Sequence, residues 1–431
     1  MRYNELYLWF LSDPAAPRYV GELRLVDAGK GVSLQYGAGW LANGFPLSED
    51  LVLVGVEQLP RWKGMAVGAV DDARPDRWGE RVIQYIDKPA RLSIMEYLFY
   101  AGDDRFGALG VSTSANTYVP RTKSPLPRLV QAQQLSEVVR KVSAKEPLND
   151  IERKMLAAGG SFGGAKPKAL IEIAGEQWVI KFFNNEPIDV PLIEHASMTL
   201  AKLADIKVAE TQVVRLVGEH ALAVRRYDRD GVMRVHCISA GTALRAETVA
   251  GQEPELGYPN LAQLLRRVGV AEDGLNLLDM QELFRRMVFN ILIDNTDDHE
   301  KNHAFMVVAP TKQGKYRLAP AYDVLTTNSG QGTQEFIVGI DQRDSTLSNA
   351  MSQCELFGYS PLQAAAEVVR VIQVVDGWRT HFAACGVSDA DLASLAERID
   401  GDPLLGQRRT FDPADYATPA RPKRRRSPFA R

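Results

Sequence analysis

The sequence lacks the features of membrane proteins and of disulfide-rich secreted proteins. No run of apolar residues approaches the ~20 residues that a membrane-spanning helix needs. The first fourteen residues contain acidic side chains and no continuous apolar core, so they do not predict a signal peptide. Only three cysteines occur, widely spaced and without a CxxC pair, which argues against a zinc site or a disulfide framework. We therefore expect a soluble protein of the reducing cytoplasm that does not enter a membrane.

A strong overall charge is also lacking, because the net charge is only −3. The last eleven residues, RPKRRRSPFAR, nevertheless hold six bases and no acid, and removing those six charges leaves −9 for the rest. A basic tail over 406–431 is expected to be disordered, with contact to nucleic acid as the alternative. The remaining chain, 45% apolar overall, is long enough to bury a core in two or three domains.

Spacing of apolar residues in the first part of the chain predicts strands and short helices. Residues 19–26 alternate between apolar and polar side chains, and 50–56 form a short apolar run, as in strands. Residues 80–86 and 93–102 have helical spacing. Three prolines within 117–128 predict a linker or a crossing loop.

The middle of the chain predicts a β-hairpin flanked by helices. Its strands, 169–173 and 177–183, meet at a turn containing Gly175. Helical spacing is found on both sides of the hairpin, over 129–144, 151–158 and 191–204. Asp150 is expected to cap the second of these helices.

The pattern from about residue 260 onward is mainly helical. Asp279 and Glu282 have the spacing of a capping box at the start of a helix over 280–293. Further helices are expected around 362–375 and 391–399, the latter capped by Ser388.

Residues 295–302, NTDDHEKN, place many polar side chains directly behind the apolar helix. Asp297 and Asn302 have the spacing D-x-x-x-x-N, which in protein kinases puts a catalytic base and a metal ligand on one loop. A carboxylate can accept the proton of an attacking hydroxyl, and a carboxamide oxygen suits Mg²⁺. By chance alone, roughly one such pair occurs in a chain of this length, so a solvated turn remains the alternative.

Two more charged residues stand among apolar neighbours. Asp323, in LAPAYDVL, needs a partner, which a magnesium ion shared with Asn302 would supply; capping at the end of a strand is the alternative. Lys181, in WVIKFF, is either exposed at the edge of a sheet or held by a partner. The partner would be a nucleotide phosphate or Glu194 of the next helix, although Glu172 and Glu176 lie nearer in sequence.

The segment 159–168, GGSFGGAKPK, is rich in glycine but has no GK[ST] ending and no GxGxxG, so it matches neither the P-loop nor the loop of ordinary kinases. Its backbone N–H groups could still approach phosphates, with Lys166 and Lys168 adding charge; a flexible surface loop is the alternative. A glycine-rich loop, a strand lysine, a helix acid, D-x-x-x-x-N and a second acid follow one another in the order of a phosphoryl-transfer kinase.

These segments resemble the HipA-type serine/threonine kinase toxins of bacterial toxin–antitoxin pairs. The resemblance extends from GELRLV near the start to about residue 400, and it is most specific in SFGGAKPK, VIKF, RRYDR, NTDDHEKNH and LAPAYDVL. It implies an α+β, two-lobed fold like that of protein kinases. The implied parts are a β-rich accessory subdomain over 1–120, a nucleotide-binding lobe over 129–228, a mainly helical lobe over 229–405 and the basic tail, for which the family offers no role.

The resemblance also implies that ATP and Mg²⁺ are the cofactors. Asp297 would be the catalytic base, Asn302 and Asp323 the metal ligands, and Ser161 a site of autophosphorylation. The segment ALAVRRYDR would hold the adenine, chiefly by backbone atoms, and His299 would orient the loop. The residues expected around the nucleotide are Ser161, Phe162, Gly163, Gly164, Lys168, Lys181, Arg226, Tyr227 and His299.

By the same resemblance, the partners would be a small helix-turn-helix antitoxin, DNA through that antitoxin, and a protein substrate such as an aminoacyl-tRNA synthetase. Phosphorylation of the substrate would arrest growth. A non-catalytic regulator that binds antitoxin and DNA is one alternative. A kinase of small molecules or lipids is another, because the loop lacks the HRD form.

Overall fold

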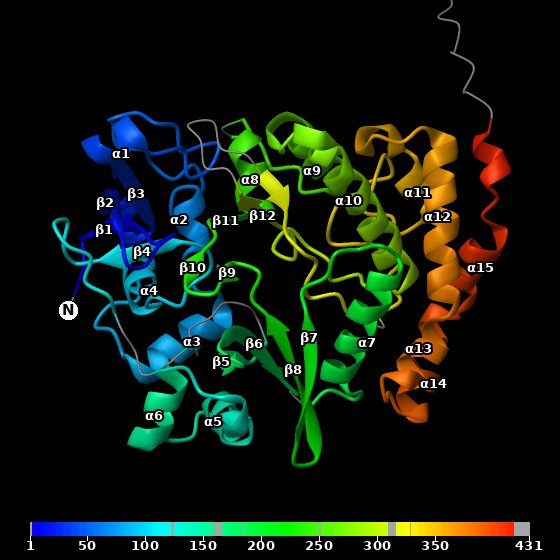
Figure 1. Ribbon diagram of the computed structural model, residues 1–431, viewed down its shortest axis with the longest axis horizontal. Coiled ribbons are helices and arrows are strands. Elements are labelled where there is room, and N and C mark those ends of the chain that lie inside the picture. Colours follow the sequence, from blue (N-terminus) through cyan, green and yellow to red (C-terminus); the bar gives the residue numbers. More distant parts are fainter. Residues whose placement is uncertain are drawn as a thin grey trace, which may run out of the picture.

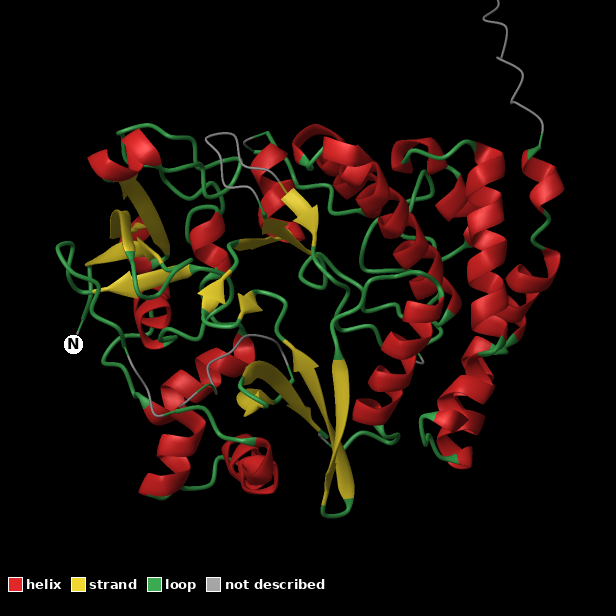
Figure 2. Ribbon diagram, in the orientation of Figure 1, coloured by secondary structure: helices red, strands yellow, loops and turns green. Residues whose placement is uncertain are grey.

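The structure is a computed structural model, and it describes residues 2–121, 125–157, 159, 166–183, 185–249, 251–308, 316–327 and 329–417. Three groups of elements lie side by side (Figure 1): an N-terminal sheet, a second sheet beside α5 and α6, and a large group of helices. Figure 2 shows the strands on one side of the molecule and in its centre, with helices filling the other side. The structure thus has the expected mixed α and β composition.

The N-terminal sheet is antiparallel and has the strand order β3-β2-β1-β4. Its strands are β1 (Glu5–Phe10), β2 (Arg18–Val26), β3 (Gly31–Tyr36) and β4 (Leu109–Ser112). The strand expected over 19–26 is therefore confirmed as β2. The strand expected over 50–56 is wrong, because β3 meets the chain beyond it only at isolated bridges, and Val52, Val54 and Val56 are exposed.

Four helices accompany this sheet in the first hundred residues: α1 (Ala38–Asn43), α2 (Ala69–Asp72), α3 (Arg77–Ile86) and α4 (Ile94–Tyr100). The last two confirm the helices expected over 80–86 and 93–102. Ser93 and Glu96 form a capping box at the start of α4, which explains why this helix begins at Ile94.

The second sheet has the order β5-β6-β8-β7. Its strands are β5 (Lys168–Ile173), β6 (Glu176–Phe182), β7 (Thr211–Leu216) and β8 (Glu219–Arg225). The hairpin around Gly175, which has the positive φ of 84° that favours glycine in a tight turn, is confirmed. The helices around the sheet are α5 (Ala132–Ala144), α6 (Asp150–Ala157) and α7 (Val190–Leu203).

The cap of α6 differs from the expectation. Asn149 Oδ1 accepts a hydrogen bond from the backbone N–H of Glu152 at 3.0 Å, so Asn149 is the capping residue and Asp150 is the first residue of the helix. Two neighbouring residues that both favour the cap position explain the one-residue error.

The C-terminal part is mainly helical and carries two small β-structures. A three-stranded sheet has the order β11-β12-β13, and a two-stranded ribbon joins β9 to β10. The strands are β9 (Arg229–Asp230), β10 (Met233–Arg234), β11 (Cys237–Ser239), β12 (Ala304–Val307) and β13 (Tyr316–Leu318). The helices are α8 (Ala240–Glu247), α9 (Tyr258–Val268), α10 (Leu275–Leu292), α11 (Leu347–Met351), α12 (Pro361–Asp376), α13 (Trp378–Ala384), α14 (Asp389–Ile399) and α15 (Asp402–Thr410).

Two expectations for this part are corrected. The capping box at Asp279 and Glu282 is wrong, because α10 begins at Leu275 and both acids lie inside it, where they pair with Arg317 and Arg286. The tail boundary at residue 406 is also wrong, since residues up to Thr410 continue α15 and a 3₁₀ turn spans Pro413–Tyr416. The cap at Ser388 is confirmed, because its hydroxyl accepts a hydrogen bond from the Asp391 N–H.

The buried side chains form two hydrophobic clusters. The larger one joins the N-terminal sheet to α7 and to the C-terminal helices in one continuous core. The smaller one joins β5 and β6 to α5 and also includes Trp78 and Val82 of α3. Helix α3 therefore packs with the second sheet, although its sequence belongs to the N-terminal part. No helix among the described residues is both long and apolar enough to cross a membrane.

Candidate active site

A lysine held between two acids marks the place where β6, α7 and the segment after β13 meet. Lys181 Nζ lies 2.5 Å from Glu194 Oε1 and 2.7 Å from Asp323 Oδ1. The Lys181 side chain is only 13% exposed, and that of Glu194 only 4%. The expected pairing of Lys181 with Glu194 is confirmed, and Asp323 is its second partner. Because the ammonium is largely out of water, it needs both carboxylates.

The charged side chains of this group shift one another's pKa values. Burial raises the pKa of Glu194. Burial also acts against the charge on Lys181, but Asp323 and Glu194 outweigh it and hold the pKa of Lys181 above its usual value. Burial would raise the pKa of Asp323, yet Lys181 and Lys168 hold that pKa well below its usual range. Lys181 and Asp323 are therefore both charged at neutral pH.

Lys168, the first residue of β5, lies directly opposite Lys181 in the hairpin. Its side chain is buried, and burial followed by the nearby charge of Lys181 lowers the pKa of Lys168. Two ammonium groups thus lie near the same two carboxylates, those of Asp323 and Glu194, and Asp323 is the more exposed of these acids. Two cations at one place are suited to binding a phosphate.

Asp323 has an unusual backbone conformation. Its φ of 59° lies in the left-handed region, which costs energy for residues other than glycine, although Asp tolerates it better than most. The side chain remains 42% exposed while one oxygen bonds Lys181. The strained backbone thus directs a carboxylate toward the lysine and toward solvent together.

The loop that follows α10 closes on itself. The Asn302 side-chain amide donates to the Asp297 backbone oxygen at 3.2 Å, and the Asn302 N–H donates to the His299 backbone oxygen at 2.9 Å. His299 Nδ1 accepts from the Lys301 N–H at 3.2 Å, consistent with a part in orienting the loop. Asn302 is buried, whereas the Asp297 side chain is exposed.

The surroundings of Asp297 suit a base. Partial removal of water raises the pKa of its carboxyl, the nearby His299 opposes this effect, and the negative charge of Asp323 adds to it. A carboxylate with a raised pKa accepts a proton more readily than an ordinary aspartate does. The Tyr322 hydroxyl, next to Asp323, donates to the Lys301 backbone oxygen at 2.8 Å, which places the loop beside the lysine site.

A buried hydrogen-bond network, which the sequence did not predict, lies behind the loop. Asp298 accepts a short hydrogen bond from the Tyr258 hydroxyl and lies 3.0 Å from His303 Nε2. The Asn290 side chain donates to the Tyr258 hydroxyl at 2.9 Å. Burial would raise the pKa of Asp298, but His303 and Tyr258 hold it below its usual value. The sequence does not show which of the two adjacent acids in NTDDHEKNH points inward, because a loop lacks the regular alternation of buried and exposed side chains found in helices and strands.

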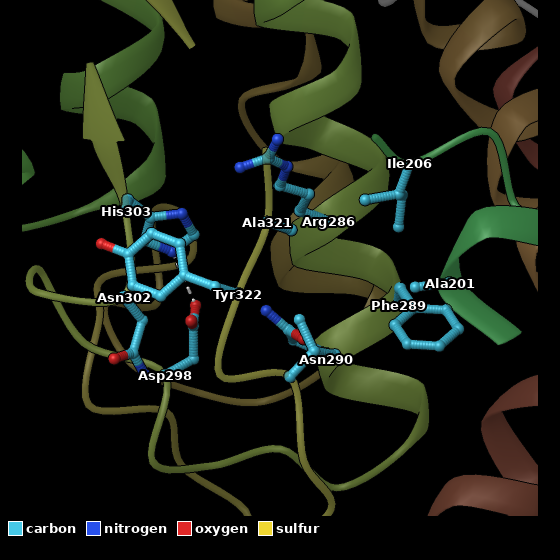
Figure 3. A pocket seen from close by; sticks show the side chains of 11 residues that line it. Ala201, Ile206, Arg286, Phe289, Asn290, Asp298, Asn302, His303, Ala321 and Tyr322 are labelled. Atoms are coloured by element: carbon cyan, nitrogen blue, oxygen red, sulfur yellow. Dashed lines mark hydrogen bonds and ion pairs between the residues drawn. The ribbon is translucent and has the colours of Figure 1, made fainter. Parts of the chain in front are cut away.

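Part of this network lines a small pocket between α7, α10, the loop and the segment before Asp323 (Figure 3). The lining residues are Ala201, Ile206, Arg286, Phe289, Asn290, Asp298, Asn302, His303, Ala321, Tyr322 and Val324. Figure 3 shows Asp298 and His303 turned toward each other at one side of the pocket, with Asn290 of α10 across from them. The pocket lies on the inner side of the loop, whereas Asp297 is on the exposed side.

The segment after β8 contains a buried group of charges that we call the hinge cluster: Arg226, Asp228 and Arg229. Both arginines bond Asp228 Oδ2, at 2.7 and 2.9 Å. Arg226 also donates to the backbone oxygens of Asp104 and Arg105, each at 2.9 Å. The Arg226 guanidinium is thus used in joining this segment to the N-terminal part. The expected contact of Arg226 with nucleotide therefore remains a prediction for its backbone alone.

Tyr227, expected at the nucleotide, stacks on Tyr322 with ring centroids 5.4 Å apart. Tyr322 directly precedes Asp323, so the stack joins the segment of the hinge cluster to the acid that bonds Lys181. Four other expected residues, Ser161, Phe162, Gly163 and Gly164, lie outside the described residues. Lys166 is described and lies 3.9 Å from Glu186.

The residues present fit magnesium better than a transition metal. Within the described residues, no group of three or more His, Cys, Asp or Glu side chains is arranged to hold a metal ion. Asn302 and Asp323 would supply hard oxygen ligands, and Mg²⁺ is commonly held by one or two such residues together with phosphate and water. This donor set agrees with the expected cofactor.

Residues 160–378, about half of the chain, match the family described as HipA-like C-terminal domain. The chain belongs to the HipA-like family. A relative from Sinorhizobium fredii, named "Putative kinase Y4dM", is 32% identical over 170 residues, which cover 36% of this chain and 39% of the relative. A second relative, from Haemophilus influenzae and named "Putative kinase", is 25% identical over 193 residues, which cover 39% of this chain and 53% of the relative. The chain thus aligns with about two fifths to one half of the length of these relatives.

The HipA-like fold extends over nearly the whole chain. A chain in the solved complex of the Shewanella oneidensis toxin–antitoxin proteins HipA and HipB with operator DNA is similar with a TM-score of 0.67. The similarity covers 94% of this chain and 97% of that chain, at 17% sequence identity. The expected kinase-like, two-lobed HipA architecture is therefore confirmed.

Proposed function

We propose that this HipA-like protein is an ATP- and Mg²⁺-dependent serine/threonine protein kinase that acts as a growth-arresting toxin. The observation that carries the proposal is the Lys181 ammonium held by Glu194 and Asp323, beside a loop that presents Asp297 and Asn302. Kinases use the same four kinds of group for phosphate binding, metal binding and proton removal. The names of the relatives agree with this activity.

Each residue has a separate part in the proposed reaction. Lys181 and Lys168 bind the phosphates, and Asn302 and Asp323 hold the magnesium ion, which neutralises charge on the phosphates when bound. Asp297 accepts the proton of the attacking hydroxyl, as its raised pKa favours. The Tyr227–Tyr322 stack holds the segment 226–229 in place, and the backbone of this segment receives the adenine.

Ser161 is proposed as the autophosphorylated residue. A phosphate there adds about −1.5 to −2 charges, which would compete with ATP for the same N–H groups and lysines. Mass spectrometry of the active protein beside its Asp297→Asn form tests this step. Phosphate on Ser161 in the active form alone is expected, together with weaker ATP binding; an unmodified Ser161 in an active kinase contradicts it.

The proposed partners follow from the similar structure, in which HipA is assembled with HipB and operator DNA. We propose a small helix-turn-helix antitoxin, DNA bound through it, and a cytoplasmic protein substrate such as an aminoacyl-tRNA synthetase. Growth arrest on expression without the antitoxin, relieved by Asp297→Asn, is the expected result in cells.

The decisive test is transfer of the γ-phosphate of ATP by the purified protein. We expect transfer with Mg²⁺ and none with a chelator, and we expect Asp297→Asn to lower the rate by ~100-fold or more because it removes the base but keeps the shape. Transfer at the wild-type rate by Asp297→Asn would contradict the mechanism. Nucleotide binding without transfer by the wild type would favour a non-catalytic regulator, and transfer to a small molecule or lipid alone would favour the other alternative.

A further inference from the structure

Helix α3 connects the N-terminal part of the chain to both sides of the candidate active site. Trp78, only 1% exposed, packs with the second sheet and donates from Nε1 to the Lys168 backbone oxygen at 2.6 Å. Two residues earlier, Asp76 Oδ1 lies 2.6 Å from Lys301 Nζ. One contact thus reaches β5 at Lys168, a candidate phosphate-binding lysine, and the other reaches the loop that carries Asp297.

Both contacts act at sensitive points of the site. Lys301 directly precedes Asn302, and its backbone oxygen accepts from the Tyr322 hydroxyl at 2.8 Å, next to Asp323. The loop is therefore held on two sides, by Asp76 through the Lys301 side chain and by Tyr322 through the Lys301 backbone. Movement of this residue by a fraction of an ångström would move Asn302 with it.

The Asp76 carboxylate is not used to cap its own helix. Asp76 occupies the N-cap position of α3, yet among the described residues its side chain accepts no capping hydrogen bond. It points instead to Lys301, a residue 225 positions away in sequence. An aspartate at this position usually accepts a hydrogen bond from the backbone of its own helix. Asp76 instead bonds a residue of another element, so its side chain serves to position the two elements relative to each other.

We propose that Asp76 and Trp78 are positioning residues for phosphoryl transfer, and that α3 sets the separation between the phosphate-binding strand and the catalytic loop. This inference rests on the proposed function and assigns the N-terminal part a role inside the active site. Neither residue touches the reacting atoms. They act through Lys168 and Lys301.

The two contacts should respond differently to salt. The side chains of Asp76 and Lys301 are 36% and 53% exposed, so added salt screens their attraction. The Trp78 hydrogen bond is neutral and buried, so it should be insensitive to salt. Salt sensitivity therefore separates the contribution of Asp76 from that of Trp78.

The first test exchanges the charges of the ion pair. Binding of Mg²⁺ with a non-hydrolysable ATP analogue is titrated for the wild type, Asp76→Lys, Lys301→Asp and the double exchange. Each single change places like charges together, and we expect it to weaken binding and to lower kcat by roughly 10- to 100-fold, as small misplacements of reacting groups do. The double exchange should recover most of both losses.

A matched control uses the pair Lys141 and Glu152, which has the same separation of 2.6 Å but joins α5 to α6. Its single and double exchanges should leave binding and kcat unchanged. If Asp76→Lys does not fold, Asp76→Asn provides a milder variant, because no capping bond of its own helix is lost. Folded Asp76 variants that bind and react like the wild type, or a double exchange that recovers neither, overturn the inference.

The second test is Trp78→Phe, which keeps an aromatic ring and removes the N–H. We expect the KM for ATP to rise several-fold at any salt concentration, with a smaller change in kcat, because the contact acts through the strand of Lys168. A fall in thermal stability without a change in KM would show a merely structural role. The binding titrations decide the inference even if the wild type transfers no phosphate, so its failure is distinguishable from failure of the proposed function.

Discussion

Lys181 is the residue on which the charges of the site depend. Lys181→Met would leave Glu194 buried without a counter-charge, and breaking a buried pair in this way costs about 3 kcal/mol. We expect a loss of this size in the free energy of unfolding, together with loss of nucleotide binding, measured by urea denaturation and titration. Lys141→Met, at a solvent-exposed pair, should lower the free energy of unfolding by much less, because exposed ion pairs contribute little to stability. Equal losses for the two variants would contradict the assignment.

The contribution of the Lys181–Asp323 ion pair to the free energy of unfolding has a predictable dependence on pH. The folded pKa of Asp323 is depressed, so its stabilisation is present above its unfolded pKa and is lost as pH falls through the folded value. The folded pKa of Lys181 is raised, so its stabilisation is present below its unfolded pKa and is lost as pH rises through the folded value. Between these limits, which include neutral pH, the contribution is constant.

His299 should act on the pH profile of the reaction. The positive charge of His299 lowers the pKa of Asp297 and so holds the acid limb of the profile at lower pH. Removing that charge with His299→Asn should move the acid limb of kcat to higher pH. Rates measured from pH 4 to 8 for both proteins test this shift. An unmoved acid limb would indicate that Asp297 is not the titrating base.

The loop after α10 contains both residues that the sequence predicted and a residue that only the structure identified. Its motif led to Asp297 and Asn302, because the spacing D-x-x-x-x-N has chemical meaning. The buried Asp298, by contrast, is recognised only once Tyr258 and His303 are seen around it. A contact between residues 40 positions apart leaves no periodic trace in the sequence.

Asp298→Asn should show whether the buried network stabilises the loop, as distinct from the direct part of Asp297 in the reaction. The amide keeps the size of the carboxylate but removes the negative charge and acceptor capacity that serve Tyr258 and His303, at a cost of about 1–3 kcal/mol. We expect a lower melting temperature and a lower kcat. Asp297→Asn, at an exposed position, should lower kcat with little change in melting temperature. The same melting temperature in wild type and Asp298→Asn would argue against the network.

Helix α15 is the element that corrects the predicted tail. Arg408, with a side chain 2% exposed, lies 2.8 Å from an Asp376 oxygen of α12 and 3.0 Å from an Asp400 oxygen after α14. Arg408→Met should cost about 1–2 kcal/mol, since both acids keep some contact with water. Truncation after residue 417 should leave the melting temperature unchanged, whereas truncation after residue 405, the predicted end of the helical lobe, should lower it. Equal melting temperatures for the two truncations would restore the earlier boundary.

At the scale of the whole molecule, the sequence predicted local patterns well and long-range pairings poorly. The β5–β6 hairpin, Lys181 on it and the next helix, which carries Glu194, were predictable because these elements are close in sequence and have clear periodicity. Asp279 was misread because a capping box and a buried ion pair use the same residues, and its partner Arg317 lies 38 positions away. Asp76 and Trp78 gave no signal, since their partners belong to other parts of the chain.

The hinge cluster has a consequence for how the polypeptide can be divided. Asp228 accepts from the Gly107 N–H at 2.8 Å, Arg229 donates to the Gly107 and Arg105 backbone oxygens, and one hydrophobic core continues across the same boundary. We therefore expect the two sides to stay together after folding even when the covalent connection between them is cut. A protease site engineered into the exposed connection near Asn116 and Thr117 should yield fragments that elute together and separate only in denaturant. After such cleavage, the N-terminal part would behave as a non-covalently bound subunit of the C-terminal part.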